Sequence, residues 1–222
     1  MPANDTLELS RDIRQRELIP PDKLSTTKAT VVGVGAIGRQ VAMQLAAIGV
    51  SHLSLVDYDV VGVENLGPQG FNECDVGLPK VTSVSQTCQA INPSVVVTTA
   101  NRKFRAIQFT GGVFFCCVDG IETRASIFRQ IMSRTNLFVD GRMSAEYLRV
   151  LVAHDEQSVK HYETTLFSAG EAYQGPCTSK STIYCSNIAA GLMVAQFAKW
   201  LRGCQLDNEV DFNILTNEAG TS

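Results

Sequence analysis

Three closely spaced glycines are the first residues of this chain whose type and spacing suggest chemistry. Gly33, Gly35 and Gly38 lie at the end of an apolar, β-branched run at residues 29–34. A turn without side chains lets the backbone approach a phosphate at the positive end of the following helix. Asp57 lies 19 residues after Gly38 and ends a second apolar run, where a carboxylate can accept hydrogen bonds from ribose hydroxyls. This pattern predicts a nucleotide site that fits NAD(P) as well as ATP; the alternative is a purely structural turn.

Polar residues further along the chain distinguish between these nucleotides. The set comprises Asp57, Asp59, Asn65, Gln69, Lys80, Asp119 and Arg124. Attack of a carboxylate on the α-phosphate of ATP builds charge on the leaving pyrophosphate, which a lysine, a metal held by a carboxylate and backbone N–H groups stabilise. A dehydrogenase needs no such set. Taken singly, these residues also have ordinary interpretations, such as a turn cap for Asp59, a solvated lysine for Lys80 and a helix cap for Asp119.

In this order, the motifs resemble the adenylating domain of the ThiF, MoeB and ubiquitin-activating (E1-like) family, over about residues 11–203. The resemblance implies that Gly33, Gly35 and Gly38 bind the ATP phosphates. It also implies that Asp57 holds the ribose. The other nucleotide-binding residues that it implies are Asp59, Asn65, Gln69 and Lys80.

The same resemblance implies the catalytic residues and the cofactors, ATP and Mg²⁺. Asp119 would hold Mg²⁺, Arg124 would lie beside it, and Lys80 would act on the phosphates. Arg14, in the segment Arg-Asp-Ile-Arg-Gln at residues 11–15, would reach the ATP of a neighbouring subunit, which implies a homodimer. The sequence holds no Cys-x-x-Cys pair, so the zinc ligands of many bacterial relatives are missing and we expect no zinc.

One position departs from the family pattern Asn-Leu-any-Arg-Gln. Residues 65–69 place Pro68 where the arginine is expected. Loss of one charge-assisted contact costs about 1.5–3 kcal/mol, or roughly ten- to a hundredfold in rate. Arg39 or Arg102 could substitute; the alternative is a catalytically weak scaffold that binds nucleotide and a partner.

The seven cysteines are an odd number without regular spacing, which favours free thiols and a reducing compartment. Three of them fall within a predicted helix or strand and are expected to pack there: Cys88, Cys116 and Cys117. Cys177 follows Gly-Pro in a polar segment and resembles the catalytic cysteine of compact E1 enzymes, which implies a thioester intermediate. Cys185 is the second choice, and an exposed cysteine without a role is the alternative.

The elements that position these residues are predicted from apolar runs and helical spacing. Strands are expected at residues 29–34, 52–56, 95–99, 113–118 and 137–139, and helices in the segment that ends at Gly49 and at residues 80–91, 122–134 and 187–201. Residues 147–154 predict an antiparallel extension near the C-terminus. The fold class is therefore α/β, a doubly wound Rossmann-like, mostly parallel sheet with helices on both faces. We expect one domain over residues 1–222, with an N-terminal arm at 1–28 and a crossover loop at 155–180.

Arg142 follows the predicted strand at residues 137–139, at the edge where ligands bind in such sheets. Its side chain could steer the C-terminal tail of a partner. A salt bridge at the edge of the sheet explains its position equally well.

Composition limits the remaining function classes. The chain has 222 residues, of which 45% are hydrophobic and 18% charged, with a net charge of −3 and a pI near 5.6. These values exclude a disordered chain and a global basic field for nucleic acid. We see no signal peptide and no run of about 18 apolar residues, so we expect a soluble, cytoplasmic protein without membrane contact.

The motifs together predict ATP-dependent adenylation of a C-terminal carboxylate. The substrate would be a small ubiquitin-like or sulfur-carrier protein that ends in glycine, and an E2-like enzyme or a sulfurtransferase would accept the product. Cys177 would take the acyl group. The alternatives are the weak scaffold and an NAD(P)-dependent oxidoreductase.

Overall fold

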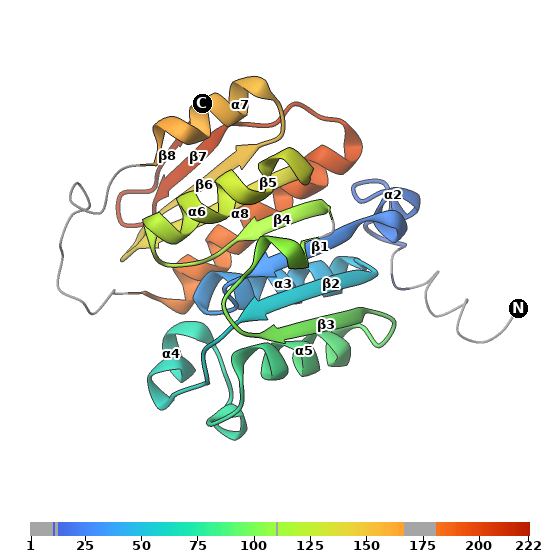
Figure 1. The fold of residues 1–222 in the computed structure, drawn as a ribbon, viewed down its shortest axis with the longest axis vertical. Coiled ribbons are helices and arrows are strands. Elements are labelled where there is room, and N and C mark those ends of the chain that lie inside the picture. Colours follow the sequence, from blue (N-terminus) through green and yellow to red (C-terminus); the bar gives the residue numbers. More distant parts are fainter. Residues whose placement is uncertain (1–10, 12, 110, 167–180) are drawn as a thin grey trace, which may run out of the picture.

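The computed structural model describes residues 11, 13–109, 111–166 and 181–222 (Figure 1). Within these residues the strands are β1 (Lys28–Val32), β2 (His52–Asp57), β3 (Val96–Asn101), β4 (Gly112–Cys116), β5 (Thr135–Ser144), β6 (Tyr147–Ala153), β7 (Glu209–Asn213) and β8 (Glu218–Thr221). The α-helices are α2 (Pro21–Thr26), α3 (Ala36–Ile48), α4 (Leu66–Gln69), α5 (Lys80–Ile91), α6 (Ile121–Ile131), α7 (Glu156–Thr164) and α8 (Ile183–Arg202). Short 3-10 helices are η1 (Val63–Asn65), η2 (Glu73–Asp75), η3 (Ala106–Gln108) and η4 (Met132–Arg134).

The strands form one sheet in the order β3-β2-β1-β4-β5-β6-β7-β8. The first five in this order are parallel, and β6, β7 and β8 continue the sheet antiparallel. In β1, Val31 is paired with Leu55 of β2 on one side and with Phe115 of β4 on the other. The strand order reverses between β1 and β4, and a crevice forms at the carboxyl ends of strands at such a point. The predicted doubly wound, mostly parallel sheet with an antiparallel extension is confirmed.

Helices cover both faces of the sheet (Figure 1). On one face, Val31 and Phe115 lie in a cluster with buried residues of α3, α5 and α8. On the other face, Phe114 and Phe138 stack with ring centroids 5.6 Å apart, and Phe138 lies against Tyr162 of α7 and a phenylalanine of α6. The predicted helices on both faces are therefore confirmed. None of the helices in the described residues combines the length and the apolar character that crossing a membrane requires.

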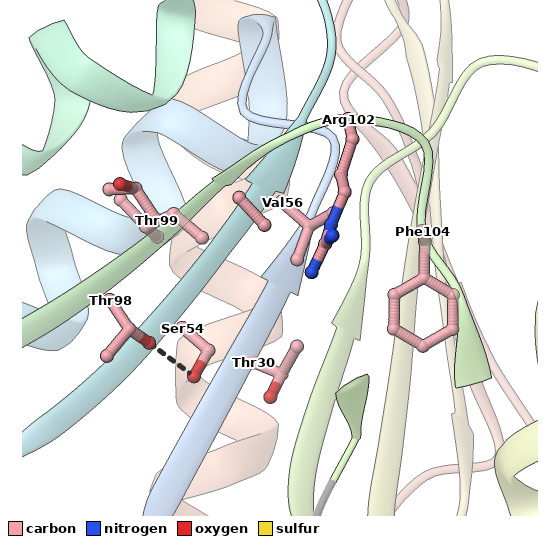
Figure 2. A pocket seen from close by; sticks show the side chains of 9 residues that line it. Thr30, Ser54, Val56, Thr98, Thr99, Arg102 and Phe104 are labelled. Carbon is pink, nitrogen blue, oxygen red and sulfur yellow. Dashed lines mark hydrogen bonds between the residues drawn. The ribbon is translucent and has the colours of Figure 1, made fainter. Parts of the chain in front are cut away.

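The face opposite α3 and α5 carries no α-helix over β1, β2 and β3, because the described part of the connection from β3 to β4 forms only η3. Polar strand residues lie on this face, and the Ser54 and Thr98 hydroxyl oxygens are 2.9 Å apart. Figure 2 shows the shallow hollow that they line together with Thr30, Val56 and Arg102. The hollow borders the crevice at the carboxyl ends of the strands.

Several predicted bounds agree with the structure and others do not. The helix predicted at residues 80–91 is α5, and β6 is antiparallel as predicted. The prediction of a loop at residues 155–180 was wrong for its first part, because residues Glu156–Thr164 form α7. This helix begins at an aspartate cap and has few apolar residues, so its periodicity in the sequence is weak. Strands β7 and β8 were not predicted, and the predicted arm at residues 1–28 contains α2 and the first residue of β1.

Candidate functional site

A cleft with a volume of about 770 Å³ lies at the carboxyl ends of β1, β2 and β4. This is the point where the strand order reverses, the usual ligand position in an open α/β sheet. The charged residues that line it are Asp57, Asp59, Lys80, Arg102, Lys103, Asp119, Glu122, Arg124 and Arg142. Apolar side chains complete the wall, among them those of Val56, Phe104 and Ile127.

The glycine turn forms one wall of this cleft and leads from β1 into α3. Gly33 has φ +81°, and a Cβ atom there would lie 2.7 Å from the carbonyl oxygen of Cys117, so only glycine fits. Gly35 is the N-cap of α3, and no side chain caps this helix. The N–H groups of the first turn therefore remain available to an anion in the cleft. Gly38 does not line the cleft; a Cβ there would meet the Gly33 carbonyl oxygen at 1.8 Å, so its role is close packing of the helix.

Asp57, at the end of β2, holds the glycine turn in place. Its carboxylate accepts hydrogen bonds from the backbone N–H of Val34 at 2.7 Å and from that of Asp59 at 2.9 Å. The side chain lines the cleft, so the predicted ribose ligand also connects β2 to the turn after β1. Such a contact fixes the position of the turn before any ligand arrives.

Lys80, the first residue of α5, pairs with Asp59 across the cleft wall. The ammonium group lies 3.1 Å from Asp59 Oδ2, and the Lys80 N–H donates to the Asp59 carbonyl oxygen at 2.9 Å. The lysine side chain is 8% exposed and the aspartate side chain 48%. The cation is thus held beside the glycine turn by a partner that remains open to solvent.

Tyr58 indicates where negative charge gathers in the cleft. The charge of Asp59, with smaller contributions from burial, Asp119 and Asp57, raises the pKa of the Tyr58 hydroxyl. The three carboxylates therefore act on one point of the cleft. Mg²⁺ prefers one or two carboxylates together with phosphate oxygens, and this donor set fits such an ion. Within the described residues, no group of three carboxylate, histidine or cysteine side chains could hold a metal without a ligand's help.

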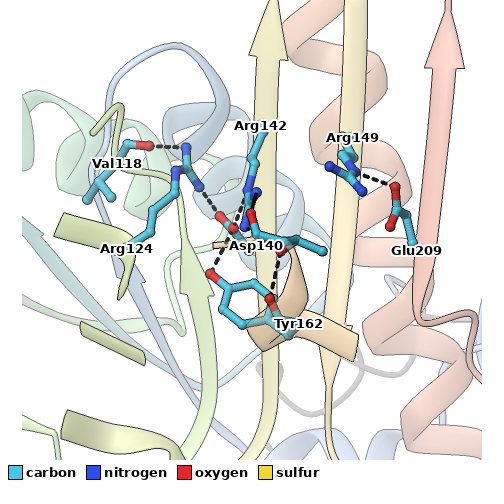
Figure 3. Close-up of polar contacts among 8 residues, drawn as sticks. Val118, Arg124, Asp140, Arg142, Arg149, Tyr162 and Glu209 are labelled. Carbon is cyan, nitrogen blue, oxygen red and sulfur yellow. Dashed lines mark hydrogen bonds and ion pairs between the residues drawn. The ribbon is translucent and has the colours of Figure 1, made fainter. Parts of the chain in front are cut away.

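A buried ion cluster includes two of the arginines that line the cleft, Arg124 and Arg142 (Figure 3). Asp140 of β5 is fully buried and pairs with Arg124 of α6, while Arg142 Nε lies 2.8 Å from Asp140 Oδ2. The Tyr162 hydroxyl donates to the same carboxylate at 3.0 Å. Arg142 also donates to the Thr165 carbonyl oxygen at 3.0 Å. For Arg142, the structure supports the interpretation as a salt bridge at the edge of the sheet.

Arg124 and Asp119 both line the cleft, as the resemblance implied, but the guanidinium of Arg124 is already engaged. It pairs with Asp140 and donates to the carbonyl oxygen of Val118, the residue before Asp119. Burial lowers the pKa of Arg124. The contact to Val118 positions the backbone that carries Asp119.

Of the other predicted residues that the structure describes, Gln69 lines the cleft and Asn65 does not. The buried Oε1 atom of Gln69 has no hydrogen-bond partner among the described residues. A carboxamide carries two N–H donors beside its oxygen, and a half-turn of the group would present N–H to a phosphate. The Asn65 Oδ1 atom accepts from the Gly62 N–H at 3.0 Å and stabilises the turn. Cys177 lies outside the described residues.

Arg14 is exposed and lies far from the cleft of its own chain. Its neighbour Arg11 donates to the Ile91 carbonyl oxygen at the end of α5, and Gln15 donates to the Ile48 carbonyl oxygen at the end of α3. Both helices begin at the cleft, and the 13 residues of α3 span about 20 Å. Arg14 therefore sits at the opposite edge of the sheet.

Sequence reasoning missed several residues that line the cleft, among them Tyr58, Lys103 and Phe104. It also missed Asp140, the buried carboxylate that pairs with Arg124 and Arg142. Arg102 was considered only as a substitute for the arginine missing at Pro68, together with Arg39. Arg39 is buried with its guanidinium 5.2 Å from the centroid of the Phe71 ring and does not line the cleft, so that suggestion was wrong. A basic pair directly after a parallel strand was the signal for Arg102 and Lys103, because it places both at the ligand-binding edge.

Comparisons with known proteins agree with this geometry. A model of the ThiF family matches residues 9–221. The molybdopterin-synthase adenylyltransferase of Haemophilus influenzae is 33% identical over 116 residues, 49% of this chain and 47% of that protein. Ubiquitin-like modifier-activating enzyme 5 of Culex quinquefasciatus is 32% identical over 123 residues, 48% of this chain and 31% of that enzyme. The chain thus spans less than half the length of these curated relatives.

Solved structures show the same architecture. The crystal structure of Escherichia coli MccB superposes with a TM-score of 0.81 at 15% identity and covers 97% of this chain and 69% of that chain. The MccB complex with AMPCPP and MccA superposes with a TM-score of 0.72 at 17% identity and covers 91% of this chain and 65% of that chain. Identity this low shows the fold alone. Since the family model matches nearly the whole length, this chain belongs to the ThiF family.

Proposed function

We propose that this chain binds ATP with Mg²⁺ in the cleft and adenylates the C-terminal carboxylate of a small ubiquitin-like or sulfur-carrier protein. One observation carries the proposal: the uncapped start of α3, Lys80 and Asp119 line one cleft at the point where the strand order reverses. A polyphosphate needs backbone N–H groups, a cation and a metal-binding carboxylate, and these three features supply them.

The reaction makes one bond and breaks one. A carboxylate oxygen of the partner attacks the α-phosphorus, and the bond from this phosphorus to the bridging oxygen of the β-phosphate breaks. The electron pair leaves on pyrophosphate, so no general acid or base is required. Lys80 stabilises the leaving charge, and the turn at Gly33 and Gly35 holds the phosphates in line. Mg²⁺, held at Asp119, would neutralise phosphate charge and orient the leaving group.

The nature of the relatives supports the substrate class. Two curated relatives bear the names molybdopterin-synthase adenylyltransferase and ubiquitin-like modifier-activating enzyme 5. One solved MccB structure contains ATP, and another contains AMPCPP together with MccA. An oxidoreductase is disfavoured, since hydride transfer gives no role to Lys80 or Asp119. The alternative of a catalytically weak scaffold remains because Pro68 replaces the arginine of the family pattern.

Transfer of the acyl group to Cys177 is a second, separate step of the proposal. The carbonyl carbon of the adenylate would form a thioester with Cys177, and AMP would leave. Of the described cysteines, Cys117 alone lines the cleft, and burial raises the pKa of its thiol. Burial also raises the pKa of Cys185, the second choice. A raised pKa makes the reactive thiolate harder to form at Cys117 and Cys185, and Cys177 remains the proposed acceptor.

ATP–pyrophosphate exchange in the presence of small β-grasp proteins with a C-terminal glycine tests the adenylation step. Asp119→Ala is expected to lower exchange by about a hundredfold or more, while Cys177→Ala retains it. Asp22→Ala, which removes an exposed carboxylate on α2, is the matched control and keeps wild-type exchange. Wild-type protein that binds ATP but exchanges no pyrophosphate with any of these partners would leave the scaffold as the function.

A further inference from the structure

The basic residues of the cleft differ in whether their charge is already neutralised. Lys80 pairs with Asp59, and Arg124 and Arg142 share the buried Asp140. Arg102 and Lys103 also line the cleft and are exposed. Neither has an ion pair with a carboxylate anywhere in the part of the chain that the structure describes. These two residues therefore hold the cleft's unneutralised positive charge among the described side chains.

Arg102 and Lys103 lie at the same edge of the sheet as Asp59 and Lys80. Arg102 and Lys103 directly follow β3, which lies beside β2 and ends at the same edge. The Lys103 ammonium lies 5.5 Å from the centroid of the Tyr58 ring, a cation–π contact. The charge of Asp59 and, to a smaller extent, that of Asp119 raise the pKa of the Tyr58 hydroxyl. Lys103 thus lies over the residue that precedes Asp59, the partner of Lys80.

Arg102 occupies the border between the cleft and the neighbouring hollow. Figure 2 shows its side chain extending from the loop after β3 toward Val56 and Thr30. It lines both the cleft and the hollow, together with Phe104. A long exposed side chain at this border can swing into the cleft without disturbing any ion pair.

The turn at residues 65–69 cannot provide such a charge. The Asn65 side chain accepts a hydrogen bond from the Gly62 N–H, and Pro68 carries no charged group. Gln69 from the same turn lines the cleft, so an arginine at position 68 would be the sequence neighbour of a lining residue. In this chain the free cations enter the cleft from the opposite side, after β3.

We propose that Arg102 and Lys103 bind the β- and γ-phosphates of the nucleotide and neutralise the charge that moves onto pyrophosphate when the α-phosphorus is attacked. This inference rests on the proposed function, since it requires a nucleoside triphosphate in the cleft. The two residues act as charged hydrogen-bond donors, and no proton transfer or covalent bond to either is involved. Their contribution grows as the bond to the leaving group breaks.

Calorimetric titration of full-length protein with ATP and with AMP tests the proposal, because AMP lacks the two outer phosphates. Arg102→Ala and Lys103→Ala are each expected to weaken ATP binding by about ten- to a hundredfold and to leave AMP binding unchanged. Lys103→Arg keeps the charge and is expected to retain ATP binding. Arg129→Ala, which removes an exposed charge on α6 outside the cleft, is the matched control.

The outcomes separate this inference from the proposed function. Wild-type protein that binds no ATP would overturn both. Wild-type protein that binds ATP, with both alanine variants binding it equally well, would overturn the role of Arg102 and Lys103 alone. An equal loss for ATP and AMP would also overturn it, since contact with the base or the ribose would then explain the effect. A loss of ATP binding in the alanine variants with AMP binding intact supports the proposal.

Discussion

Pro68 is the residue at which this chain departs from the pattern it otherwise follows, and it lies beside a residue of the cleft wall. Replacing Pro68 with arginine places a guanidinium next to Gln69. If the chain adenylates its partner, we expect Pro68→Arg to raise ATP–pyrophosphate exchange by about tenfold or more, because one charge-assisted contact to a phosphate contributes about 1.5–3 kcal/mol. Steady-state exchange at saturating partner concentration measures the effect.

Pro68→Ala is the control for this substitution. It removes the rigid ring without adding a charge, so it separates a backbone effect from an electrostatic one. An increase of equal size in both variants would show that the charge is not responsible. No exchange in either variant, with ATP bound, would favour a scaffold.

Asp140 is a second residue whose role can be isolated, since its carboxylate alone neutralises two arginines in the cleft wall. With the carboxylate removed, Arg124 remains 5% exposed without its ion-pair partner. Loss of one partner of a buried ion pair costs about 3–5 kcal/mol. Asp140→Asn is therefore expected to lower the free energy of unfolding by about this amount, measured by urea denaturation.

Asp22→Asn on α2 removes a carboxylate from an exposed position and is expected to change the free energy of unfolding by less than about 0.5 kcal/mol. A change below about 1 kcal/mol for Asp140→Asn would contradict the view that this carboxylate is required by the two arginines. The slope of unfolding against urea should remain constant, because both variants keep the same buried surface.

At the scale of elements, α7 depends on the cap that sequence reasoning overlooked. The Asp155 carboxylate accepts hydrogen bonds from the Ser158 hydroxyl at 2.6 Å and the Ser158 N–H at 2.8 Å. These bonds lower the pKa of Asp155 from 3.8. A carboxylate whose pKa is lower in the folded state stabilises the fold above its unfolded pKa, and this stability is lost as the pH falls through the folded pKa.

Asp155→Ala is therefore expected to lower the free energy of unfolding by about 0.5–2 kcal/mol at neutral pH. The difference from wild type should shrink as the pH falls through about 3.8, where the carboxylate of the unfolded chain takes up a proton, and should be lost at the lower pH where the native carboxylate is protonated as well. Urea denaturation at neutral pH and at about pH 3 measures both values. Glu163→Gln, in the last turn of the same helix, serves as the control, and an unchanged difference at both pH values would contradict the assigned role of the cap.

The elements that could be predicted are those whose side chains repeat a burial pattern. The helix α5 and the strands β1, β2 and β4 contain regular apolar positions that pack against the central layers. Helix α7 and strands β7 and β8 lie at the far end of the sheet and bury few residues, so they leave little periodicity. Their positions depend on caps and on pairing with β6, which the local sequence does not reveal.

The site was predictable where its residues belong to local turns and not where they meet across the fold. Gly33, Asp57 and Lys80 stand at strand ends or helix starts, which the sequence marks clearly. Asp140 takes its role from Arg124 and Tyr162, which come from separate helices. Such partnerships follow from packing and not from spacing along the chain.

At the scale of the whole molecule, the position of Arg14 suggests how the site is completed. It lies at the edge of the sheet opposite the cleft, beyond the far ends of α3 and α5. A side chain there cannot reach a nucleotide bound in its own chain. The homodimer that the resemblance implies would solve this geometry if its twofold axis placed the arm of one subunit at the cleft of the other.

Mixing two inactive variants tests this arrangement. Arg14→Ala lacks the donated arginine, and Asp119→Ala lacks the metal ligand, so each is expected to show little exchange alone. In a mixed dimer, the cleft that keeps Asp119 receives Arg14 from the other subunit and becomes complete. Random pairing of equal amounts should restore about a quarter of the wild-type exchange. No recovery, although mass measurements show that mixed dimers form, would mean that Arg14 does not act across the subunits.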